Sequence, residues 1–460
     1  MKEIMVSVIM PCLNVKDFIE EAIESVLNQT LKDIELIIVD ADSDDGTVEI
    51  IDKYRNQDDR IVFLHSDRKS MGYQYNIGIK KAKGKYIGFV ESDDYIDTKM
   101  YEELVGTAEQ NELDFVKSDF DVFIGDKNER FFLNYVVLST ADEDLYNNVI
   151  NPADYSAIIY RDVSMWNGIY KRDFIEKNRI FLNETAGAAF QDIGFILKSF
   201  MKAERIMYVH IPSYHYRKDN LNASVYNKVK HIKFVMDEMR FITEFMNSED
   251  ICSPFRAVIF HRLFGSFCAY YDEYINSNQK IEETEKQLEE FFLFIKDCYK
   301  KLEYHEINKE KIDKILSLTA LLRSVEDFKV VRENISYLNK KGRKDFFESI
   351  KNRDIVIFGA GEVGQSIYAC LYRNNIKSIL CFCDNDIKKQ GTNIMGLPCV
   401  SLDKITESCY NSDICFIIAN IAHYNDIIKQ LIKNNTERKN IIKSTDILPL
   451  IAFEINIKEL

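Results

Sequence analysis

The amino-acid sequence predicts an α/β protein with three parts: an N-terminal α/β domain, a helical middle region and a small C-terminal α/β domain. Strand-type and helix-type segments alternate from Val6 onward, as expected for a sheet with crossover helices. Residues 266–341 contain no glycine or proline and favour helices. A glycine-rich loop then follows a new apolar strand. We therefore expect domains at residues 1–220, 221–350 and 351–460.

The first acidic cluster ends a predicted βαβ unit. Residues 6–10 and 34–39 have the apolar pattern of strands, and residues 14–28 that of an amphipathic helix. The second strand ends in Asp40 and Asp42. Ligands of open α/β sheets bind beyond the carboxyl ends of the strands. Carboxylates at this edge could therefore accept hydrogen bonds from a base or a ribose.

The second acidic cluster is Glu91-Ser92-Asp93-Asp94, directly after the apolar residues 86–90. Crowded carboxylates repel one another and resist desolvation unless a cation or hydrogen-bond donors compensate them. A divalent metal that carries a phosphate would do so. The alternative is a polar turn in which Asp94 or Asp97 caps the next helix. If both clusters share one edge of the sheet, the site suits a nucleotide-sugar.

Several ordered motifs resemble the family-2 glycosyltransferases of the GT-A fold. They are Val6-Ser7-Val8-Ile9-Met10-Pro11, Val39-Asp40-Ala41-Asp42-Ser43-Asp44-Asp45-Gly46-Thr47, Asn76-Ile77-Gly78-Ile79, Ala82-Lys83-Gly84-Lys85-Tyr86-Ile87 and Glu91-Ser92-Asp93-Asp94. The resemblance continues through residues 166–171 and 190–192 to residues 216–220. It therefore covers about the first 220 residues and implies a GT-A catalytic domain.

The resemblance also implies a donor site at the acidic edge of the sheet. Asp40 and Asp42 match the positions that hold the base and the ribose, near a loop that contains Pro11 and Asn14. Two further positions of the matching motifs are Asn76 and Ser92. Ala41 and Tyr75 depart from the common aspartate and arginine, which puts the identity of the nucleotide in doubt.

Glu91 and Asp93 match the metal motif of the family, with Asp93 as the direct ligand of Mn²⁺ or Mg²⁺ and Glu91 reaching the ion through water. Such hard cations take one or two carboxylates plus substrate phosphates. A late histidine is a metal ligand in some GT-A enzymes, which makes His215 a further candidate. Its alternative is an ordinary β pattern around residues 208–216.

Asp192 is the candidate catalytic base. It precedes an apolar helical pattern, so it would lie in the first helical turn near the positive end of the dipole. A helix-start aspartate without a catalytic role is the alternative. The resemblance favours the base, because residues 190–192 match the segment that carries it in inverting members.

Two cationic or aromatic candidates have equally plausible structural roles. Arg217, with Lys218 beside it, could add positive charge near the leaving diphosphate, or lie solvated on a surface loop. Trp166, the single tryptophan, matches a segment that stacks on the acceptor sugar, although a lone tryptophan is as often part of a core.

Composition limits the compartment and the partners. The net charge of -14 argues against nucleic-acid binding, which relies on clustered basic residues. The sequence lacks both a signal peptide and an apolar run of the roughly 20 residues that span a membrane, so we expect a cytoplasmic protein, with peripheral docking at the membrane as an option. The ten cysteines lack paired spacing and are expected to be buried thiols.

The middle and C-terminal regions leave several alternatives open. The helices of the middle region suit a linker that packs between domains, or a partner-binding or homodimer surface. After a strand at residues 354–358, the loop contains Gly359, Gly361 and Gly364, and a second strand ends in Asp384. This spacing is typical of a dinucleotide-binding βαβ unit. The region also resembles small Rossmann-like domains beside sugar-modifying enzymes, in which a nucleotide or a structural, oligomerising role is possible.

Two functions therefore remain. The first is a metal-dependent, inverting glycosyltransferase that moves a sugar from a nucleotide-diphospho-sugar, UDP being the first choice. Its acceptor would be a hydroxyl group of a bacterial surface polysaccharide, glycolipid or glycoprotein glycan. The second is a catalytically inactive nucleotide-sugar-binding or scaffold protein whose C-terminal domain mediates assembly.

Overall fold

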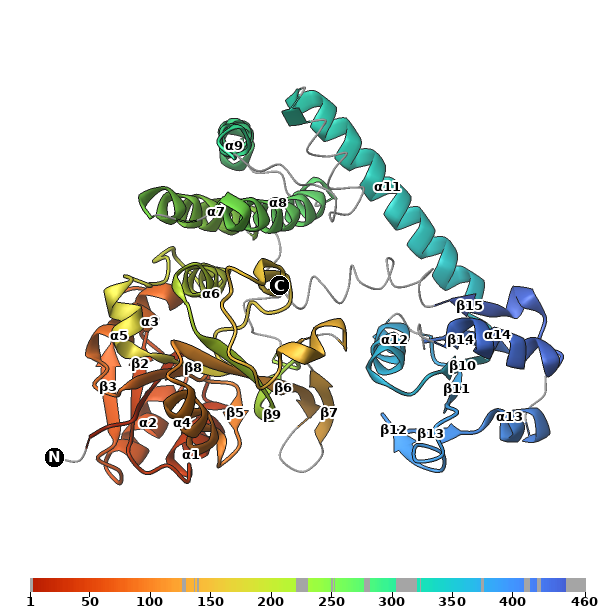
Figure 1. Ribbon diagram of the computed structural model, residues 1–460, viewed down its shortest axis with the longest axis horizontal. Coiled ribbons are helices and arrows are strands. Elements are labelled where there is room, and N and C mark those ends of the chain that lie inside the picture. Colours follow the sequence, from red (N-terminus) through yellow and green to blue (C-terminus); the bar gives the residue numbers. More distant parts are fainter. Residues whose placement is uncertain are drawn as a thin grey trace. The chain divides into compact units, whose positions relative to one another are not determined.

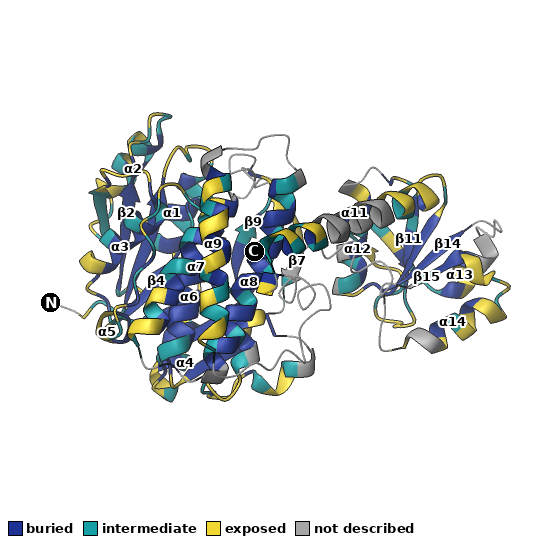
Figure 2. Cartoon of the chain, turned by 90° about the horizontal axis from the view of Figure 1, so that it is seen from above, coloured by how far each residue is buried: buried dark blue, intermediate teal, exposed yellow. Residues whose placement is uncertain are grey.

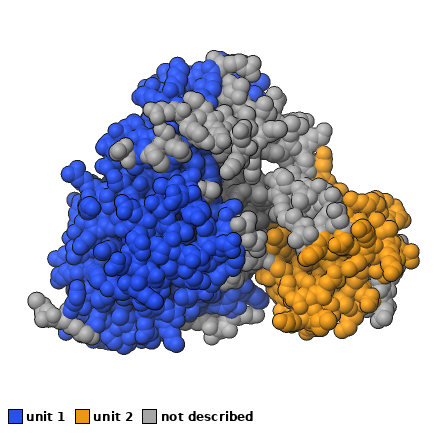
Figure 3. Space-filling view, in the orientation of Figure 1, with its two compact units in different colours: residues 1–331 blue, residues 332–460 orange. Residues whose placement is uncertain are grey.

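The chain divides into two compact units, residues 1–331 and residues 332–460 (Figure 3). The computed structural model describes residues 3–125, 130–135, 137–138, 140–220, 231–249, 251, 253–276, 282–302, 321–322, 324–373, 376–408, 414–419 and 423–443. The first unit therefore contains the expected catalytic domain together with most of the middle region. The borders at residues 220 and 350 stay predictions.

The first unit is built on one mixed sheet with the strand order β3-β2-β1-β4-β8-β6-β9-β5, and β7 pairs with β6 (Figure 1). Its strands are β1 Val6–Cys12, β2 Ile34–Asp40, β3 Ile61–His65, β4 Tyr86–Phe89, β5 Tyr95–Ile96, β6 Phe115–Gly125, β7 Arg130–Tyr135, β8 Gly168–Lys171 and β9 Ile206–Arg217. The first four in chain order are parallel, with Cys12 opposite Asp40 and Ile9 opposite Phe89. The carboxyl ends of β1, β2 and β4 therefore meet at one edge of the sheet.

Helices cover both faces of this sheet. Those of the first unit are α1 Ile19–Leu27, α2 Thr47–Arg55, α3 Met71–Lys81, α4 Met100–Asn111, α5 Arg172–Lys177, α6 Gln191–Lys202, α7 His231–Ser248, α8 Ser253–Asn276 and α9 Glu282–Lys300, with 3₁₀ turns η1 Thr140–Leu145 and η2 Ser156–Tyr160. In Figure 1, α3 and α6 lie above the sheet, and α1, α2 and α4 lie below it. Their buried stripes face the strands (Figure 2), because apolar residues recur at helical spacing.

The first helix is shorter than the sequence predicts. It begins at Ile19 rather than near Asn14, because Asn14 has a left-handed backbone with φ of 54°. The residues that follow are held as a loop: the N–H of Val15 donates to Thr47 Oγ1 at 2.9 Å, and the N–H of Lys16 donates to Asp45 Oδ2 at 3.0 Å. This loop joins the end of β1 to the acidic loop after β2.

The middle region is helical, as predicted, and it packs on the elements around the first sheet. Helices α7 and α8 contact each other, α7 contacts α6, and α9 contacts both (Figure 1). An aromatic cluster of Phe267, Phe291, Phe292 and Phe328 belongs to the same hydrophobic core as the strands of the sheet. This region is therefore part of the first unit and not only a linker.

The second unit contains a mostly parallel sheet with the order β12-β13-β11-β10-β14-β15. Its elements are α11 Val325–Ile350, which begins before the unit, β10 Ile355–Phe358, α12 Glu362–Arg373, β11 Ile379–Cys383, β12 Asn393–Ile394, β13 Leu397–Val400, α13 Leu402–Ser408, β14 Cys415–Ile418, α14 Tyr424–Lys433, the 3₁₀ turn η5 Arg438–Asn440 and β15 Ile441–Lys443. Two apolar clusters pack on opposite faces of this sheet. The parallel strands follow the doubly wound order. The predicted C-terminal α/β domain is therefore present.

A buried polar cluster holds β1, β2 and the turn before β4 together. Ser7 Oγ donates to Glu35 Oε1 at 2.6 Å, and the N–H of Gly84 donates to Ser7 Oγ at 2.8 Å. The N–H of Lys83 donates to the same Glu35 oxygen at 2.8 Å. A Cβ atom at position 84 would lie 2.4 Å from the backbone nitrogen of Ser7, so only glycine fits in this turn.

Gly84→Ala should destabilise the first unit by about 1–3 kcal/mol, because backbone atoms cannot yield to the added methyl group. The matched control is Gly106→Ala, whose Cβ would meet no atom within 4 Å in the exposed part of α4. That change should stabilise the protein by about 0.5–1 kcal/mol. Urea unfolding followed by the fluorescence of Trp166 measures both. Equal effects would contradict the close contact at Gly84.

Candidate active site

The acidic turn after β4 brings three carboxylates together. Oxygen atoms of Glu91, Asp93 and Asp94 all lie within 4.8 Å of one another. The turn closes through a backbone hydrogen bond from the N–H of Asp94 to the carbonyl of Glu91 at 3.1 Å. Among the residues that the structure describes, no other group of three potential metal ligands is this compact. The predicted cluster therefore exists as a spatial site.

Asp94 is the member of the cluster with a structural role. It is buried, and its two oxygens accept hydrogen bonds from the Tyr214 hydroxyl at 2.7 Å and from the N–H of Arg217 at 2.8 Å. Burial, with the neighbouring Asp93 and Glu91, raises its pKa well above the usual range. Asp94 does not cap a helix, since α4 begins at Met100 after a residue without a side-chain cap. It ties the end of β4 to β9.

Asp93 and Glu91 retain oxygens that could bind a cation. Asn220 donates to Asp93 Oδ2 at 2.7 Å, whereas no hydrogen bond engages the Glu91 carboxylate among the described residues. Burial raises the pKa of Asp93. The pKa of Glu91 rises to about 8, mainly because the group is buried and, to a smaller extent, because of the charges of Asp93 and Asp192. A hard divalent cation would compensate this like charge with the oxygen ligands that it prefers. The donor set therefore fits Mn²⁺ or Mg²⁺.

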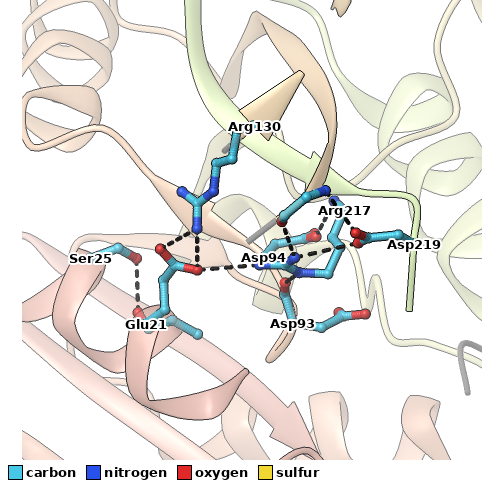
Figure 4. Close-up of polar contacts among 9 residues, drawn as sticks. Glu21, Ser25, Asp93, Asp94, Arg130, Arg217 and Asp219 are labelled. Carbon is cyan, nitrogen blue, oxygen red and sulfur yellow. Dashed lines mark hydrogen bonds and ion pairs between the residues drawn. The ribbon is translucent and has the colours of Figure 1, made fainter. Parts of the chain in front are cut away.

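Arg217 lies beside the acidic turn and holds it by several polar contacts (Figure 4). Its Nε donates to the Asp93 carbonyl at 2.9 Å, and its guanidinium contacts Glu21 at 3.2 Å and Asp219 at 3.4 Å. Arg130 contacts the same Glu21 at 2.7 Å. The side chain of Arg217 is only 5% exposed. The structure therefore gives it a bracing role, and contact with a phosphate stays a prediction.

His215 is not brought into the acidic cluster. Its ring stacks on Tyr95 with centroids 4.4 Å apart, and its two nitrogens face Asp97 at 3.1 Å and Asp121 at 3.5 Å. Burial alone would lower its pKa, but Asp121 and Asp97 raise it above the ordinary value. The compact carboxylate group contains no histidine among the described residues. His215 thus packs beside the site as part of the β5–β9 pair.

Asp192 lies in the first turn of α6, as predicted. Burial raises its pKa to about 6, while the N–H of Ile193 and the charge of Lys117 act in the opposite direction. Lys117 is itself buried and pairs with Asp162 at 2.5 Å. The charge of Asp192 also raises the pKa of Glu91, which indicates that the two lie in one electrostatic site. With a pKa of about 6, Asp192 is mostly ionised at neutral pH, and its charge acts on Glu91 of the acidic turn.

Aromatic packing connects α6 with the acidic turn. Phe89, at the end of β4, packs edge-on against Phe195 of α6 and Tyr75 of α3. The ring centroids are 5.2 Å apart in the first pair and 5.3 Å apart in the second. Asp192 is one helical turn before Phe195, and Glu91 follows Phe89 by two residues. Among the described residues, the buried Tyr75 hydroxyl has no hydrogen-bond partner. Burial raises its pKa most, followed by the charges of Glu91 and Asp192.

The predicted base and ribose residues lie at the ends of β1 and β2. Asp40 is buried and accepts from the N–H of Ser43 at 3.1 Å, whereas Asp42 is exposed, with φ of 60°, and faces His65 at 3.6 Å. The side chain of Asn14 accepts from the N–H of Asp44 at 2.9 Å. Pro11 is the residue before the last in β1, opposite Val39 of β2. These residues share the edge that carries the acidic turn.

Asn76, Ser92 and Trp166 are buried. Asn76 exchanges two hydrogen bonds with the backbone of Leu182, at 2.8 and 2.9 Å, which makes it a clamp on the segment before α6. Trp166 stacks on Tyr214 at 4.2 Å and on Tyr216 at 5.2 Å. Ser92 is the buried residue between Glu91 and Asp93. Trp166 thus supports the strand that holds Asp94, and contact with a sugar stays a prediction.

Several contacts of the site could not be predicted from the sequence. Tyr214 and Asn220 hold the acidic turn from more than a hundred positions along the chain. Gln74 donates from Nε2 to the carbonyls of Cys12 and Val39 at 2.9 and 2.7 Å, which joins the ends of β1 and β2. Their partners become apparent only when the strands are paired, because the contacts are not local.

The glycine-rich loop of the second unit forms the predicted strand-to-helix turn. Asp384 lies at the end of β11 and accepts from the N–H of Ala360 at 2.8 Å and of Asp386 at 2.9 Å. Lys389 also contacts it at 3.2 Å. Burial opposes ionisation of Asp384, but these N–H groups and Lys389 lower its pKa. The carboxylate is thus engaged inside the protein, and binding of a ribose there stays a prediction.

Among the described residues, every helix is either too short or too polar to span a lipid bilayer.

Comparisons with known proteins agree with this architecture. Residues 7–168 match the family described as glycosyl transferase family 2, and residues 351–442 match the family described as C2185-like, N-terminal. The chain is 34% identical over 215 residues to an uncharacterized glycosyltransferase, EpsJ, of Bacillus subtilis (strain 168), covering 47% of this chain and 61% of that protein. It is 26% identical over 302 residues to the putative glycosyltransferase EpsH of the same organism, covering 63% and 74%.

A solved structure shows the same fold. The crystal structure of S. aureus TarS 1-349 in complex with UDP-GlcNAc matches with a TM-score of 0.53 and 20% identity, covering 72% of this chain and 91% of that chain. The GT-A fold expected for the first unit is confirmed by this likeness. The chain spans about three fifths of the first relative, so the comparison concerns the shared region. Residues 7–168 are therefore similar to glycosyl transferase family 2, and the wider region shares its fold with TarS.

Proposed function

We propose that the protein is a metal-dependent, inverting glycosyltransferase that acts on a nucleotide-diphospho-sugar. The observation that carries this proposal is the pairing of two acidic groups with different tasks at one edge of the sheet. Glu91 and Asp93 have oxygens available for a cation, and Asp192 has a pKa of about 6 in the neighbouring helix. Pairs of carboxyl groups in different environments are typical of sites that divide binding and proton transfer between them.

The nucleotide would bind at the ends of β1 and β2. Asp40 and Asp42 offer carboxylate acceptors for a base and a ribose, and the loop with Pro11 and Asn14 lies beside them. UDP is the first nucleotide to test, since TarS, which shares the fold, has been solved with UDP-GlcNAc. The acceptor would be a hydroxyl group of a surface polysaccharide, glycolipid or glycoprotein glycan.

Asp93 and Glu91 would hold Mn²⁺ or Mg²⁺ with the donor diphosphate. When bound, such an ion neutralises charge on the departing diphosphate. The protein contributes a fixed pair of carboxylates, because three hydrogen bonds hold the turn. Asn220 donates to the Asp93 carboxylate, the N–H of Glu91 donates to the Tyr214 hydroxyl, and Arg217 Nε donates to the Asp93 carbonyl. Lys218 adds positive charge that lowers the pKa of Glu91.

Asp192 would accept the proton of the acceptor hydroxyl. The acceptor oxygen forms a bond to the anomeric carbon, the bond from that carbon to the diphosphate oxygen breaks, and the hydroxyl proton passes to Asp192. Attack from the face opposite the diphosphate inverts the anomeric centre. A base with a pKa near 6 is mostly ionised at neutral pH and still accepts a proton readily.

Asp192→Asn should lower kcat by about 10²- to 10⁴-fold, because the amide cannot accept the proton. Donor affinity should change little. In the wild type, kcat/KM should fall about tenfold per pH unit below pH 6, since protonation of Asp192 removes the base. Initial rates with a UDP-sugar panel and calorimetry with UDP measure these effects.

Asp173→Asn is the control for this experiment, since Asp173 is an exposed aspartate in the first turn of α5. It should retain wild-type kinetics. Wild-type turnover by Asp192→Asn would remove Asp192 from the mechanism.

Asp93→Asn should abolish the gain in UDP affinity that Mn²⁺ gives to the wild type, because the ion loses its principal carboxylate. Calorimetric titration of UDP with and without Mn²⁺ measures this directly, without any need for turnover. Asp97→Asn is the control, since Asp97 is exposed and pairs with His215 outside the cluster. An unchanged effect of Mn²⁺ in Asp93→Asn would contradict the metal site.

A nucleotide-sugar-binding or scaffold protein is the alternative. It predicts donor binding by the wild type without hydrolysis or transfer of any donor in the panel. The same measurements therefore separate the two functions.

A further inference from the structure

A carboxyl group from the helical middle region reaches the helix that carries Asp192. Glu238 lies in α7 and is only 3% exposed. Its Oε2 accepts a hydrogen bond from Asn183 Nδ2 at 3.0 Å. Its Oε1 is buried and has no hydrogen-bond partner among the described residues. A buried carboxyl with one unsatisfied oxygen is costly, so its position requires an explanation.

Helix α6 leaves room for this carboxyl. A Cβ atom at Gly194 would lie 1.8 Å from Glu238 Oε1 and 3.1 Å from its Cδ, so the carboxyl fills the space that a side chain would occupy. Gly194 is two residues after Asp192, within the same helical turn. The Glu238 carboxyl therefore packs against the backbone of the helical turn that carries the proposed base.

Residues 180–190, the segment before α6, are held by the same Glu238 carboxyl. Asn183 binds Glu238 by its side chain, and its carbonyl oxygen would lie 1.9 Å from a Cβ atom at Gly72 in the first turn of α3. Gln191 donates from Nε2 to the carbonyls of Thr185 and Gly187, both at 3.2 Å. The segment is thus held between α3 and α7, and it leads directly into Asp192.

We propose that Glu238 is a positioning residue for Asp192: its carboxyl, held between Asn183 and Gly194, sets the first turn of α6 and so the place of the base. This inference rests on the proposed function. It assigns a part in catalysis to α7, which lies beyond the residues that match the family.

The charges around Glu238 give this arrangement a dependence on pH. Burial raises the pKa of Glu238 to about 8; Asn183 and Lys198 lower it, whereas Asp192 and Asp237 raise it. Burial lowers the pKa of Lys198 to about 8, and Glu238 opposes this shift. Lys198 donates to the Phe181 carbonyl and lies 4.1 Å from the ring centre of Phe241, without an ion pair to Glu238 within 4 Å.

Asp192 and Glu238 therefore lose their protons in order. Between pH values of about 6 and 8, Asp192 is ionised while Glu238 keeps its proton. Above this range, Glu238 would become a second buried negative charge near Asp192. Lys198 would lose its positive charge over the same range. Repulsion and desolvation of the new charge should then displace the first turn of α6.

Glu238→Gln tests the proposal, because the amide keeps the shape of the protonated carboxyl and cannot ionise. We expect kcat and KM at pH 7 within about twofold of the wild type. Wild-type kcat should fall above pH 8, and Glu238→Gln should lose this alkaline decrease. Asp237→Asn, the neighbouring position on α7, is the control: it should keep the decrease but move it to somewhat lower pH, because Asp237 raises the pKa of Glu238. Superimposable alkaline profiles for the wild type and Glu238→Gln would overturn the proposal.

A double-mutant cycle tests the contact itself. Gly194→Ala should lower kcat by about tenfold in the wild type, because the methyl group displaces the carboxyl, with little change in the Kd of UDP. In the Glu238→Ala background, where the carboxyl is absent, the same change should lower kcat by less than about twofold. Equal effects in both backgrounds would contradict the contact.

Hydrogen exchange separates this inference from the proposed function. Amides of α6 near Asp192 should lose about tenfold in protection between pH 7 and pH 9 in the wild type, after correction for intrinsic rates, and should keep it in Glu238→Gln. If no donor is turned over but this difference is found, Glu238 still positions the turn and the proposed function fails. Constant protection in the wild type overturns the positioning role, whatever the activity.

Discussion

The candidate site depends on one interaction: the end of β9 holds the acidic turn after β4. The Tyr214 hydroxyl accepts from the N–H of Glu91 and donates to Asp94, and the N–H of Arg217 donates to the other oxygen of Asp94. Both oxygens of Asp94 are thus engaged within the protein. Asp93 and Glu91 keep oxygens that lie close together and could bind one cation. Without these hydrogen bonds, three carboxyl groups within 4.8 Å of one another could not ionise together without strong repulsion.

The second half of the candidate site lies on α6, which packs against the same hydrophobic core. Phe89 links the acidic turn to α6 through Phe195, so the proposed base and the proposed metal ligands are connected by one aromatic contact. Glu238 of α7 then holds the first turn of α6 from behind. The proposed division of roles follows from environment: burial beside Asp93 raises the pKa of Glu91 to about 8, whereas Asp192, at the start of a helix, has a pKa of about 6, which suits proton transfer at neutral pH.

The strand ends and the start of α6 could be predicted from the sequence, because both follow from local patterns. Apolar runs that stop at Asp40 and Glu91 mark the edge of a parallel sheet, and Asp192 directly precedes an apolar helical repeat. The contacts of Arg217 could not be predicted, since a basic residue near a phosphate site suggests the ligand rather than Glu21 and the Asp93 carbonyl. The role of Glu238 could not be predicted from the sequence, because it depends on the space left by the absent side chain of Gly194 in another helix.

The stereochemistry of transfer tests the central claim most directly. A donor of known anomeric configuration is supplied with an acceptor that the enzyme glycosylates, and the anomeric proton of the first product is observed by NMR. A single displacement with Asp192 as the base predicts a product of the opposite configuration. A product that retains the configuration of the donor would contradict the account, because it requires a second displacement for which the described site has been assigned no nucleophile.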